Sequence, residues 1–371
     1  MQNQFFQGLK VVELASVLAG PAVGLFFAEL GAEVIKIENA ATGGDVTRRW
    51  KAPTEAAEKT DSAYYQSINF GKKTLFVDLK EEEGREQVEA LIRAADIVIV
   101  NYRPGAAEKL QMDYESLKSL NPKIIYAELT GFGADDPRLA FDVVLQAESG
   151  FLYLTGEPDR PPVKMPVALI DILAAHQLKE GILLALLQRA QTGQGSKVST
   201  SLYAAALASL ANQATNWLIA GFAPQRLGSQ HPNIAPYGDL FRTADGQELV
   251  LAVGVEAHWK KLCEVLKIAP LVSDERFATN AQRVKYRSEL IPLLQERIGT
   301  FTTRKELLTL FQNHHIPAGA VRDVPDVFAQ PLAQALLVNT FDESGTPIQC
   351  VKSVVFELLN CSPPKQESTK Y

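Results

Sequence analysis

The chain has 371 residues, of which 46% are hydrophobic and 22% charged, as in ordinary soluble globular proteins, and this length is sufficient for two domains. Its net charge of −6 disfavours a nucleic-acid partner, so an anionic ligand would be bound by local groups of Lys and Arg. Cys263, Cys350 and Cys361 are too few and too scattered for a disulfide framework or a zinc site. The first residues, MQNQFFQGLKVVELASV, lack the basic start of a signal peptide, and we expect a cytoplasmic protein.

Strand and helix patterns alternate over the first third of the chain. The expected strands are 9–15, 32–38, 73–79, 95–102 and 123–132, and the expected helices are 20–32, 80–95 and 114–120. Strands that alternate with helices indicate βαβ units and a mostly parallel sheet. Ligands of such sheets bind at the carboxyl ends of the strands, so we expect the functional residues just after each strand.

The middle of the chain is predicted to be mostly helical. Residues 173–222 are rich in Ala and Leu, and the uncharged stretch 202–222 is long enough to span a bilayer. Asn212, Gln213 and Asn216 lie within this stretch. They favour a helix that is buried or covered by another subunit, and we expect no membrane partner.

A smaller α+β region is expected beyond the Gly- and Pro-rich loop 221–238. The next segment is typical of a hairpin that turns at Asp245 and Gly246. The helices predicted after it are 258–266, 283–298 and 304–314, and a further hairpin is predicted within 341–358.

Asp171 is the most informative single residue. It is the only charged residue between Lys164 and Lys179, apart from any charge on His176, and an apolar helix begins beside it. A carboxylate there lies near the positive end of a helix dipole, where free backbone N–H groups would keep it ionised. An ionised, poorly hydrated carboxylate is a plausible nucleophile, and an ordinary helix-capping aspartate is the alternative.

Basic and amide side chains gather near the predicted strand ends. Several such groups at one edge of a parallel sheet could hold a multiply phosphorylated ligand, although each alone is typical of a solvated surface. The groups are Arg48 and Arg49, with Asp45 beside them; Asn69, Lys72 and Lys73; and Asn101, Arg103 and Lys109. Tyr102 and Phe70 could flank an adenine ring or simply pack in the core. A dinucleotide site is a weaker interpretation, because Gly20 and Gly24 do not form the G-x-G-x-x-G pattern.

A series of short motifs runs from Leu9 to Leu332, which is nearly the whole chain. They are LKVVELASVLAGP, LGAEVIKIE, GDVTRRW, NFGKKTLFVDLK, NYRPGAAEKL, LTGFG, DVVLQAESG, the Asp171 segment, TGQGSKVSTSLY, APYGDLFRTADG, DERFATNAQRV and HHIPAGAVRDV. In number and order they are similar to the motifs of class III CoA-transferases, the family that includes formyl-CoA and carnitine CoA-transferases.

The resemblance implies that Asp171 is the catalytic aspartate, with acyl-CoA and a small carboxylic acid as substrates and with no permanently bound cofactor or metal. Asp171 would attack the thioester to form a mixed anhydride, and CoA would return to form an aspartyl-CoA thioester that the acceptor acid opens. Both intermediates require a site that excludes water. The positions that match CoA contacts of the family are Val17, Leu18, Asn69, Lys72, Lys73, Asn101, Tyr102, Arg103, Lys109, Arg138 and Phe141.

The resemblance also implies an α/β architecture. A large Rossmann-like CoA-binding domain would comprise residues 1–200 and be completed by 330–371. A linker helix would follow at 201–224, and a small α+β domain at 225–325. Two chains would interlock as rings in a homodimer.

The chain departs from the family pattern at two places, one that concerns the acid substrate and one that concerns a CoA contact. Formyl-CoA transferases carry a tetraglycine loop where this chain reads RLGSQHPNIAPYGD, so oxalate and formate are not expected. Small dicarboxylic acids such as succinate are the better candidates, with His231, Asn233 and Tyr237 of the loop 225–238 as prospective selectivity residues. Asn39 stands where some members have a CoA-binding arginine.

Two other functions remain as alternatives. The α-methylacyl-CoA racemases share the fold but use a histidine in a G-H-D segment for proton transfer, where this chain has Ala140, Phe141 and Asp142. Because phenylalanine cannot move a proton, we favour transfer over racemisation. The third interpretation is a CoA-binding protein without activity.

The transfer reaction passes through a tetrahedral oxyanion that needs hydrogen-bond donors. Backbone N–H groups near Gly131 and Gly133, or in 228–238, are the candidate donors.

Overall fold

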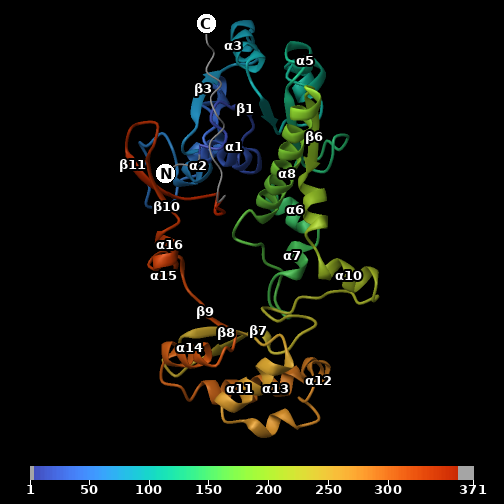
Figure 1. The fold of residues 1–371 in the computed structure, drawn as a ribbon, viewed down its shortest axis with the longest axis vertical. Coiled ribbons are helices and arrows are strands. Elements are labelled where there is room, and N and C mark those ends of the chain that lie inside the picture. Colours follow the sequence, from blue (N-terminus) through green and yellow to red (C-terminus); the bar gives the residue numbers. More distant parts are fainter. Residues whose placement is uncertain (1–3, 358–371) are drawn as a thin grey trace. The chain divides into compact units, whose positions relative to one another are not determined.

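The computed structural model describes residues 4–357, which form two compact units (Figure 1). Unit 1 combines residues up to 149 with 165–211 and with the chain from 332 onward, and unit 2 combines 150–164 with 212–331. The expected division differs at several boundaries: 150–164 belongs with unit 2, the large unit continues to 211 instead of 200, and the rest of unit 2 covers 212–331 instead of 225–325. Residues 358–371, which were assigned to the large domain and include Cys361, lie outside the described residues.

Unit 1 is built on a six-stranded parallel sheet. Its strands are β1 (Lys10–Leu14), β2 (Glu33–Asn39), β3 (Lys73–Val77), β4 (Ile97–Val100), β5 (Ile125–Thr130) and β6 (Ser196–Ser201). Their order across the sheet is β3-β2-β1-β4-β5-β6, so the direction of winding reverses between β1 and β4. In an open α/β sheet of this order, the crevice outside the carboxyl ends of the two strands at the reversal is where ligands bind.

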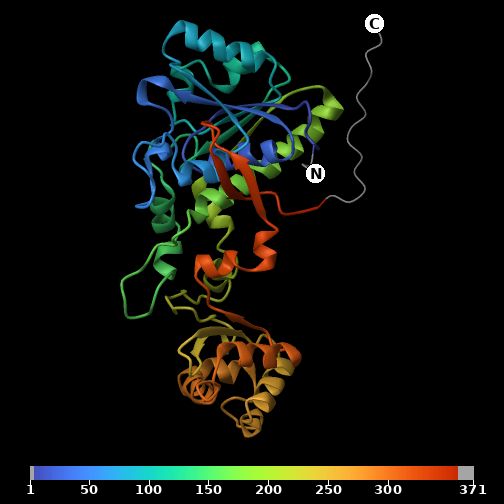
Figure 2. The same cartoon turned by 90° about the vertical axis from the view of Figure 1, so that its left-hand side faces the viewer.

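Helices cover both faces of this sheet (Figure 1, Figure 2). Side chains of α3 (Glu82–Arg93) and α5 (Tyr114–Leu120) join alternate residues of β1, β2, β4 and β5 in one core. Helix α1 (Ala19–Glu29) contacts β1, β2 and β4, and α8 (Leu169–Thr192) contacts β5, β6 and α1. Because both faces are covered, β4 reads as an unbroken apolar run, Ile-Val-Ile-Val, and is wholly buried.

The expected helical region 173–222 contains a strand that the sequence patterns did not predict. Strand β6 pairs in parallel with β5 at the edge of the sheet, and Val198 is its only apolar residue. The predicted linker helix 201–224 is also wrong. It is two short helices, α9 (Leu202–Ala208) and α10 (Asn212–Leu218), separated by Ala211 in the left-handed region with a φ of 48°.

Unit 2 holds a three-stranded antiparallel sheet of β7 (Tyr237–Arg242), β8 (Glu248–Ala252) and β9 (Ala318–Ala320). The predicted hairpin at 245–246 is confirmed as β7 and β8. A core around Trp259 and Phe277 joins the sheet to the helices. These helices are α11 (Glu256–Val265), α12 (Asn280–Lys285), α13 (Arg287–Ile298) and α14 (Arg304–Asn313), with α7 (Phe151–Leu154) and α15 (Val324–Phe328) in the same unit.

The last described segment returns to unit 1 as a hairpin (Figure 2). Its strands are β10 (Leu337–Phe341) and β11 (Pro347–Val351). A hairpin was predicted here, but within 341–358, so its first strand lies earlier than expected. Cys350 of β11 packs with Leu25 of α1. The Glu29 carboxylate accepts hydrogen bonds from the backbone N–H groups of Ser353 and Val354, which fixes the segment against the end of α1.

Candidate active site

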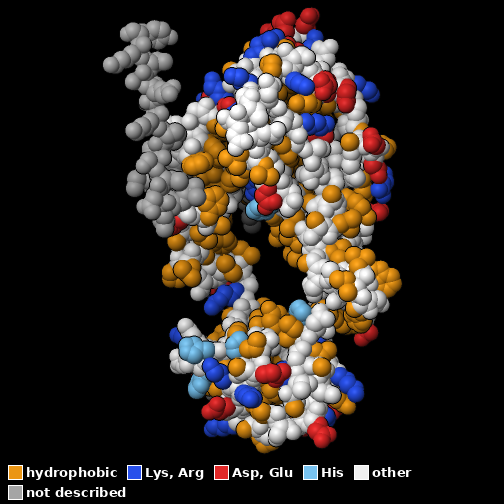
Figure 3. Space-filling view, turned by 45° about the vertical axis from the view of Figure 1, so that its right-hand side comes forward, with side chains coloured by type: hydrophobic (Ala, Val, Ile, Leu, Met, Phe, Trp, Pro, Cys, Tyr) orange, Lys and Arg blue, Asp and Glu red, His pale blue; other side chains and the backbone are white. Residues whose placement is uncertain are grey.

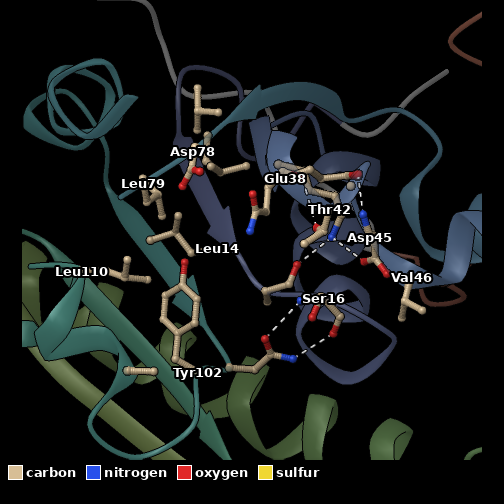
Figure 4. Close-up of a pocket in the computed structure, with 18 of the residues that line it drawn as sticks. Leu14, Ser16, Glu38, Thr42, Asp45, Val46, Asp78, Leu79, Tyr102 and Leu110 are labelled. Carbon is tan, nitrogen blue, oxygen red and sulfur yellow. Dashed lines mark hydrogen bonds and ion pairs between the residues drawn. The ribbon is translucent and has the colours of Figure 1, made fainter. Parts of the chain in front are cut away.

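Two cavities lie where β1 and β4 end, at the reversal of the sheet. The larger has a volume of about 510 Å³, the smaller about 100 Å³, and Ser16 and Asn101 line both. The larger cavity is bounded by residues that follow β1, β2, β3 and β4 (Figure 4). The smaller one is bounded by the start of α1, by Phe141 and by Asp171.

Asp171 lies in the first turn of α8 and is only 7% exposed. Within the described part of the chain, its carboxylate accepts no hydrogen bond, although it lines the smaller cavity. Its oxygens face the cavity and not the packed core, so a ligand in the cavity can reach them.

The backbone donors at the start of α8 are used by a second carboxylate, that of Asp142. Asp142 Oδ1 accepts hydrogen bonds from the N–H groups of Ile170, at 2.7 Å, and of Asp171, at 3.3 Å. Asp142 is the first residue of α6 (Asp142–Glu148), whose N-cap is Phe141. It therefore caps α8 across the fold instead of its own helix.

This arrangement corrects the expectation that helix N–H groups would keep Asp171 ionised. Burial, followed by the negative charge of Asp142, raises the pKa of Asp171 to about 7. The donors that would have lowered it are directed at Asp142 instead. Near neutral pH the Asp171 carboxyl therefore exchanges between its acid and its anion.

Gln146 holds Asp142 in place. The buried Gln146 side chain donates from Nε2 to Asp142 Oδ2 and accepts, through Oε1, the N–H of Met165 at 2.8 Å. This glutamine ties α6 to the segment that leads into α8 and helps to hold Asp142 at the start of that helix.

The similarity of this chain to known proteins decides its family. Residues 6–358 match CoA-transferase family III. The chain belongs to this family. It is 42% identical over 368 residues to the succinate–glutarate CoA-transferase of Agrobacterium fabrum (strain C58), covering 97% of this chain and 90% of the relative. It is 34% identical over 367 residues to the succinyl-CoA:glutarate CoA-transferase of Mus musculus, covering 96% and 83%.

A solved structure agrees over the same length. The crystal structure of a CAIB/BAIF family protein from Brucella suis matches with a TM-score of 0.82 and 41% identity, covering 96% of this chain and 93% of that one. The protein is a class III CoA-transferase, an enzyme that moves CoA from an acyl-CoA to a carboxylic acid. This confirms the family and the activity expected from the motifs.

Six of the residues expected to contact CoA line the two cavities of the CoA-transferase. Four of them surround the smaller cavity with Asp171 or lie at its border with the larger one: Val17, Leu18, Asn101 and Phe141. Tyr102 and Arg103 line the larger cavity. Tyr102 and Leu110 line this cavity and also pack against the core of unit 1 (Figure 4).

The other five line neither cavity. The Lys72 ammonium donates a hydrogen bond to Asn69 Oδ1 and forms an ion pair with Glu13 at 2.8 Å. Its side chain is only 1% exposed, so it is not free to bind a phosphate. Lys73 is the first residue of β3, so it lies at the amino ends of the strands, and it pairs with Glu33 at 2.7 Å.

Lys109 and Arg138 complete these five. Lys109 is exposed at the end of α4 (Ala106–Lys109). Arg138 lies 3.7 Å from the Phe132 ring centre and pairs with Asp136 at 2.8 Å. Arg48, another suggested phosphate ligand, is buried and pairs with Glu38 at 2.8 Å.

The sequence patterns missed residues that the CoA-transferase places at the cavities. Leu79 and Lys80 follow β3 and line the larger cavity. The rule that functional residues follow strands would have found them.

Tyr64 is a second residue that the sequence patterns missed. Burial and the charges of Asp171, Asp142 and Asp45 raise the pKa of its hydroxyl to about 12, so the hydroxyl lies in the electrostatic field of these aspartates.

Trp50 accompanies Tyr64. The two ring centres lie 5.1 Å apart at an interplanar angle of 78°, and Trp50 is 40% exposed. No sequence pattern distinguished this pair, because it forms only when η2 (Val46–Arg49) and α2 (Ala63–Asn69) come together. Among the described residues, no group of three or more His, Cys, Asp or Glu could hold a metal ion.

Proposed function

We propose that the CoA-transferase moves CoA between small dicarboxylic acids through covalent intermediates on Asp171. The observation that carries this proposal is the buried Asp171 carboxylate, which has no partner among the described side chains and faces a cavity beside a much larger one. A pKa of about 7 supplies an anion near neutral pH that is more basic than an ordinary aspartate.

The reaction begins when an Asp171 oxygen attacks the thioester carbonyl of the donor. The C–S bond breaks, CoA leaves as its thiolate, and a mixed anhydride remains. The thiolate attacks the Asp171 carbonyl of the anhydride, which releases the donor acid and leaves an aspartyl-CoA thioester. The acceptor carboxylate then attacks this thioester, and the returning thiolate attacks the new acyl carbonyl, which frees Asp171. The apolar walls formed by Leu129, Phe141 and Leu202 support the exclusion of water.

The larger cavity is the proposed site for the nucleotide part of CoA. Tyr102, Leu79 and Leu110 offer apolar surface to an adenine ring, and Arg103 and Lys80 offer positive charge to the phosphates. Val17, Leu18, Asn101 and Phe141 then lie near the thioester. In this proposal Lys80 replaces Lys72 and Lys73 as the phosphate ligand contributed by the β3 region.

Succinate and glutarate are the proposed acids. Two relatives carry these substrates in their names, and this chain lacks the glycine run of formyl-CoA transferases. The charge of Asp171 acts on Tyr64, which packs against Trp50, so we include this aromatic pair among the candidate contacts of the acyl chain. His231, Asn233 and Tyr237 remain prospective selectivity residues.

A cytoplasmic homodimer with a Rossmann-like large domain, interlocked as rings, is the proposed form of the enzyme. Hydrophobic side chains gather in exposed patches on the surface in Figure 3. Leu184 and Leu187 of α8 are 67% and 63% exposed, and one turn of helix separates them, so they share a face that a second copy would cover. In the described part of the chain, no helix is long and apolar enough to cross a bilayer.

Trapping with hydroxylamine tests this function. The protein is mixed with succinyl-CoA, quenched with hydroxylamine, and examined by intact-mass and peptide mass spectrometry, with glutarate as the acceptor in a parallel transfer assay. We expect a hydroxamate at Asp171 and none in Asp171→Ala, which should still bind CoA. Transfer that persists in Asp171→Ala would disprove the covalent mechanism. Proton exchange at the α-carbon without an adduct would instead indicate racemase chemistry.

A further inference from the structure

Val17 has a backbone conformation that a β-branched residue rarely adopts. Its φ is +72°, in the left-handed region. Such strain persists only where neighbours over-determine the backbone, and it is concentrated at functional sites. Val17 lines the cavity of Asp171 and directly precedes Leu18, the N-cap of α1. Its conformation therefore sets how the first turn of α1 faces the nucleophile.

Two side chains from distant parts of the chain hold this turn. Asp45 Oδ2 accepts the N–H of Val17 at 3.1 Å. Asn101 accepts the N–H of Ser16 at 3.1 Å and donates to the Ser16 carbonyl at 2.8 Å (Figure 4). Both peptide groups on the N-terminal side of Val17 are thus fixed by side chains and not by a regular element.

Buried ion pairs fix Asp45 in turn. Lys36 Nζ lies 3.2 Å from Asp45 Oδ2 and 3.0 Å from Glu13 Oε1, and these side chains are at most 1% exposed. The same ammonium donates to the Ala15 carbonyl at 2.6 Å, and Lys72 pairs with the second oxygen of Glu13. Asp45 cannot rotate away from the turn without breaking a buried ion pair, which is strongly unfavourable.

We propose that Asp45 is a positioning residue of the CoA-transferase, which holds Val17 in its left-handed conformation and thereby aligns the start of α1 with Asp171. This inference rests on the function proposed above. Asp45 lines the larger cavity, Val17 the smaller and Ser16 both, so the turn is the wall between the two cavities. A shift of about 1 Å in such a wall can lower a rate by roughly a hundredfold.

A double-mutant cycle tests the proposal. Asp45→Ala removes the acceptor of the Val17 N–H, so we expect the turn to relax and kcat to fall by about tenfold or more, with a smaller change in KM for the acyl-CoA. Glycine adopts a positive φ without strain. The same Asp45→Ala change in a Val17→Gly background should therefore lower kcat by less than about threefold. Equal losses in the two backgrounds would overturn the inference, because Asp45 would then act independently of Val17.

A matched control separates this role from helix capping. Asp45 caps η2 through Thr47, and Asp113 caps α5 through Ser116 in the same way but away from the cavities. Asp113→Ala should leave kcat within about twofold of the wild type. A crystal structure of Asp45→Ala gives a readout that needs no activity. We expect Val17 to leave the left-handed region, and a positive φ in that structure would overturn the inference even if the wild type proved inactive as a transferase.

Discussion

In the proposed mechanism, Asp171 has to meet two opposing requirements with one side chain. A nucleophile that forms labile anhydrides has to be withdrawn from water, and withdrawal favours the protonated acid, which is not nucleophilic. Asp142 raises the pKa further, yet it also occupies the helix donors that would otherwise make Asp171 a weak base. The result is a carboxyl that ionises near neutral pH and retains basicity as an anion.

Activity should therefore rise with pH through the ionisation of Asp171. We expect kcat/KM for the acyl-CoA to increase with a midpoint of about 7, because only the anion attacks. In Asp142→Asn the neighbouring charge is lost while the Asn oxygen can still accept the α8 N–H groups, so the midpoint should fall without reaching that of a solvated aspartate. The measurement is the pH dependence of kcat/KM for both proteins, and an unchanged midpoint would contradict this electrostatic coupling.

The same ionisation should make Asp171 unfavourable for stability. Its pKa is about 7 in the folded state against the ordinary value of 3.8, so the folded protein binds more protons between these values and the free energy of unfolding falls as pH rises through this window. Asp171→Asn carries no charge and should gain stability relative to the wild type, by as much as ~4 kcal/mol above pH 7 and by almost nothing near pH 4. Urea unfolding at the two pH values measures this, and an equal difference at both would refute it.

At the scale of elements, the site depends on contacts between segments that are distant in sequence. In the first turn of α8, the N–H groups of Ile170 and Asp171 are bonded by Asp142, which lies 28 positions before Ile170. The turn before α1 keeps its shape because Asp45 bonds to Val17. Helix starts of this kind are capped by the tertiary structure and not by the local residue.

This dependence explains what could be predicted from the sequence. Strands β1 to β5 were predicted because burial of their core faces gives apolar runs, whereas β6, with Val198 as its only apolar residue, lacks that signal. Asp171 was found because a lone charge beside an apolar helix is visible in the sequence. The Trp50–Tyr64 pair and the capping of α8 could not be found, since only tertiary contacts create them.

The end of β3 offers a direct comparison of two lysines. Lys80 follows the carboxyl end of the strand and lines the larger cavity, whereas Lys73 is the first residue of the strand, at its amino end. Lys80→Ala should raise KM for the acyl-CoA by roughly three- to tenfold, the loss of one charged phosphate contact, with little change in kcat. Lys73→Ala serves as the control and should leave KM unchanged. A larger effect at Lys73 would move the phosphate site away from the carboxyl ends of the strands.

At the scale of the whole molecule, the chain passes between its two units after residues 149, 164, 211 and 331. Segment 150–164 is flanked by two residues of unit 1 that are hydrogen-bonded to each other, because the Met165 N–H donates to Gln146. Gln146 is also the residue that donates to Asp142. Asp171 of unit 1 thus lies shortly after a chain segment that belongs to unit 2.

The exposed face of α8 gives the last prediction, which concerns assembly. Leu184 and Leu187 are too exposed for a helix that otherwise packs in unit 1, and covering two leucines by a second copy would contribute about 1.5–3 kcal/mol for each side chain. We expect the wild type to behave as a dimer in light scattering after size exclusion, and Leu184→Lys combined with Leu187→Lys to weaken it to a monomer at micromolar concentration. Gln87→Lys adds a charge at an exposed position of α3, away from this face of α8, and should leave the dimer intact. A wild type that is monomeric, or a double variant as dimeric as the control, would show that this face of α8 is not where two chains meet.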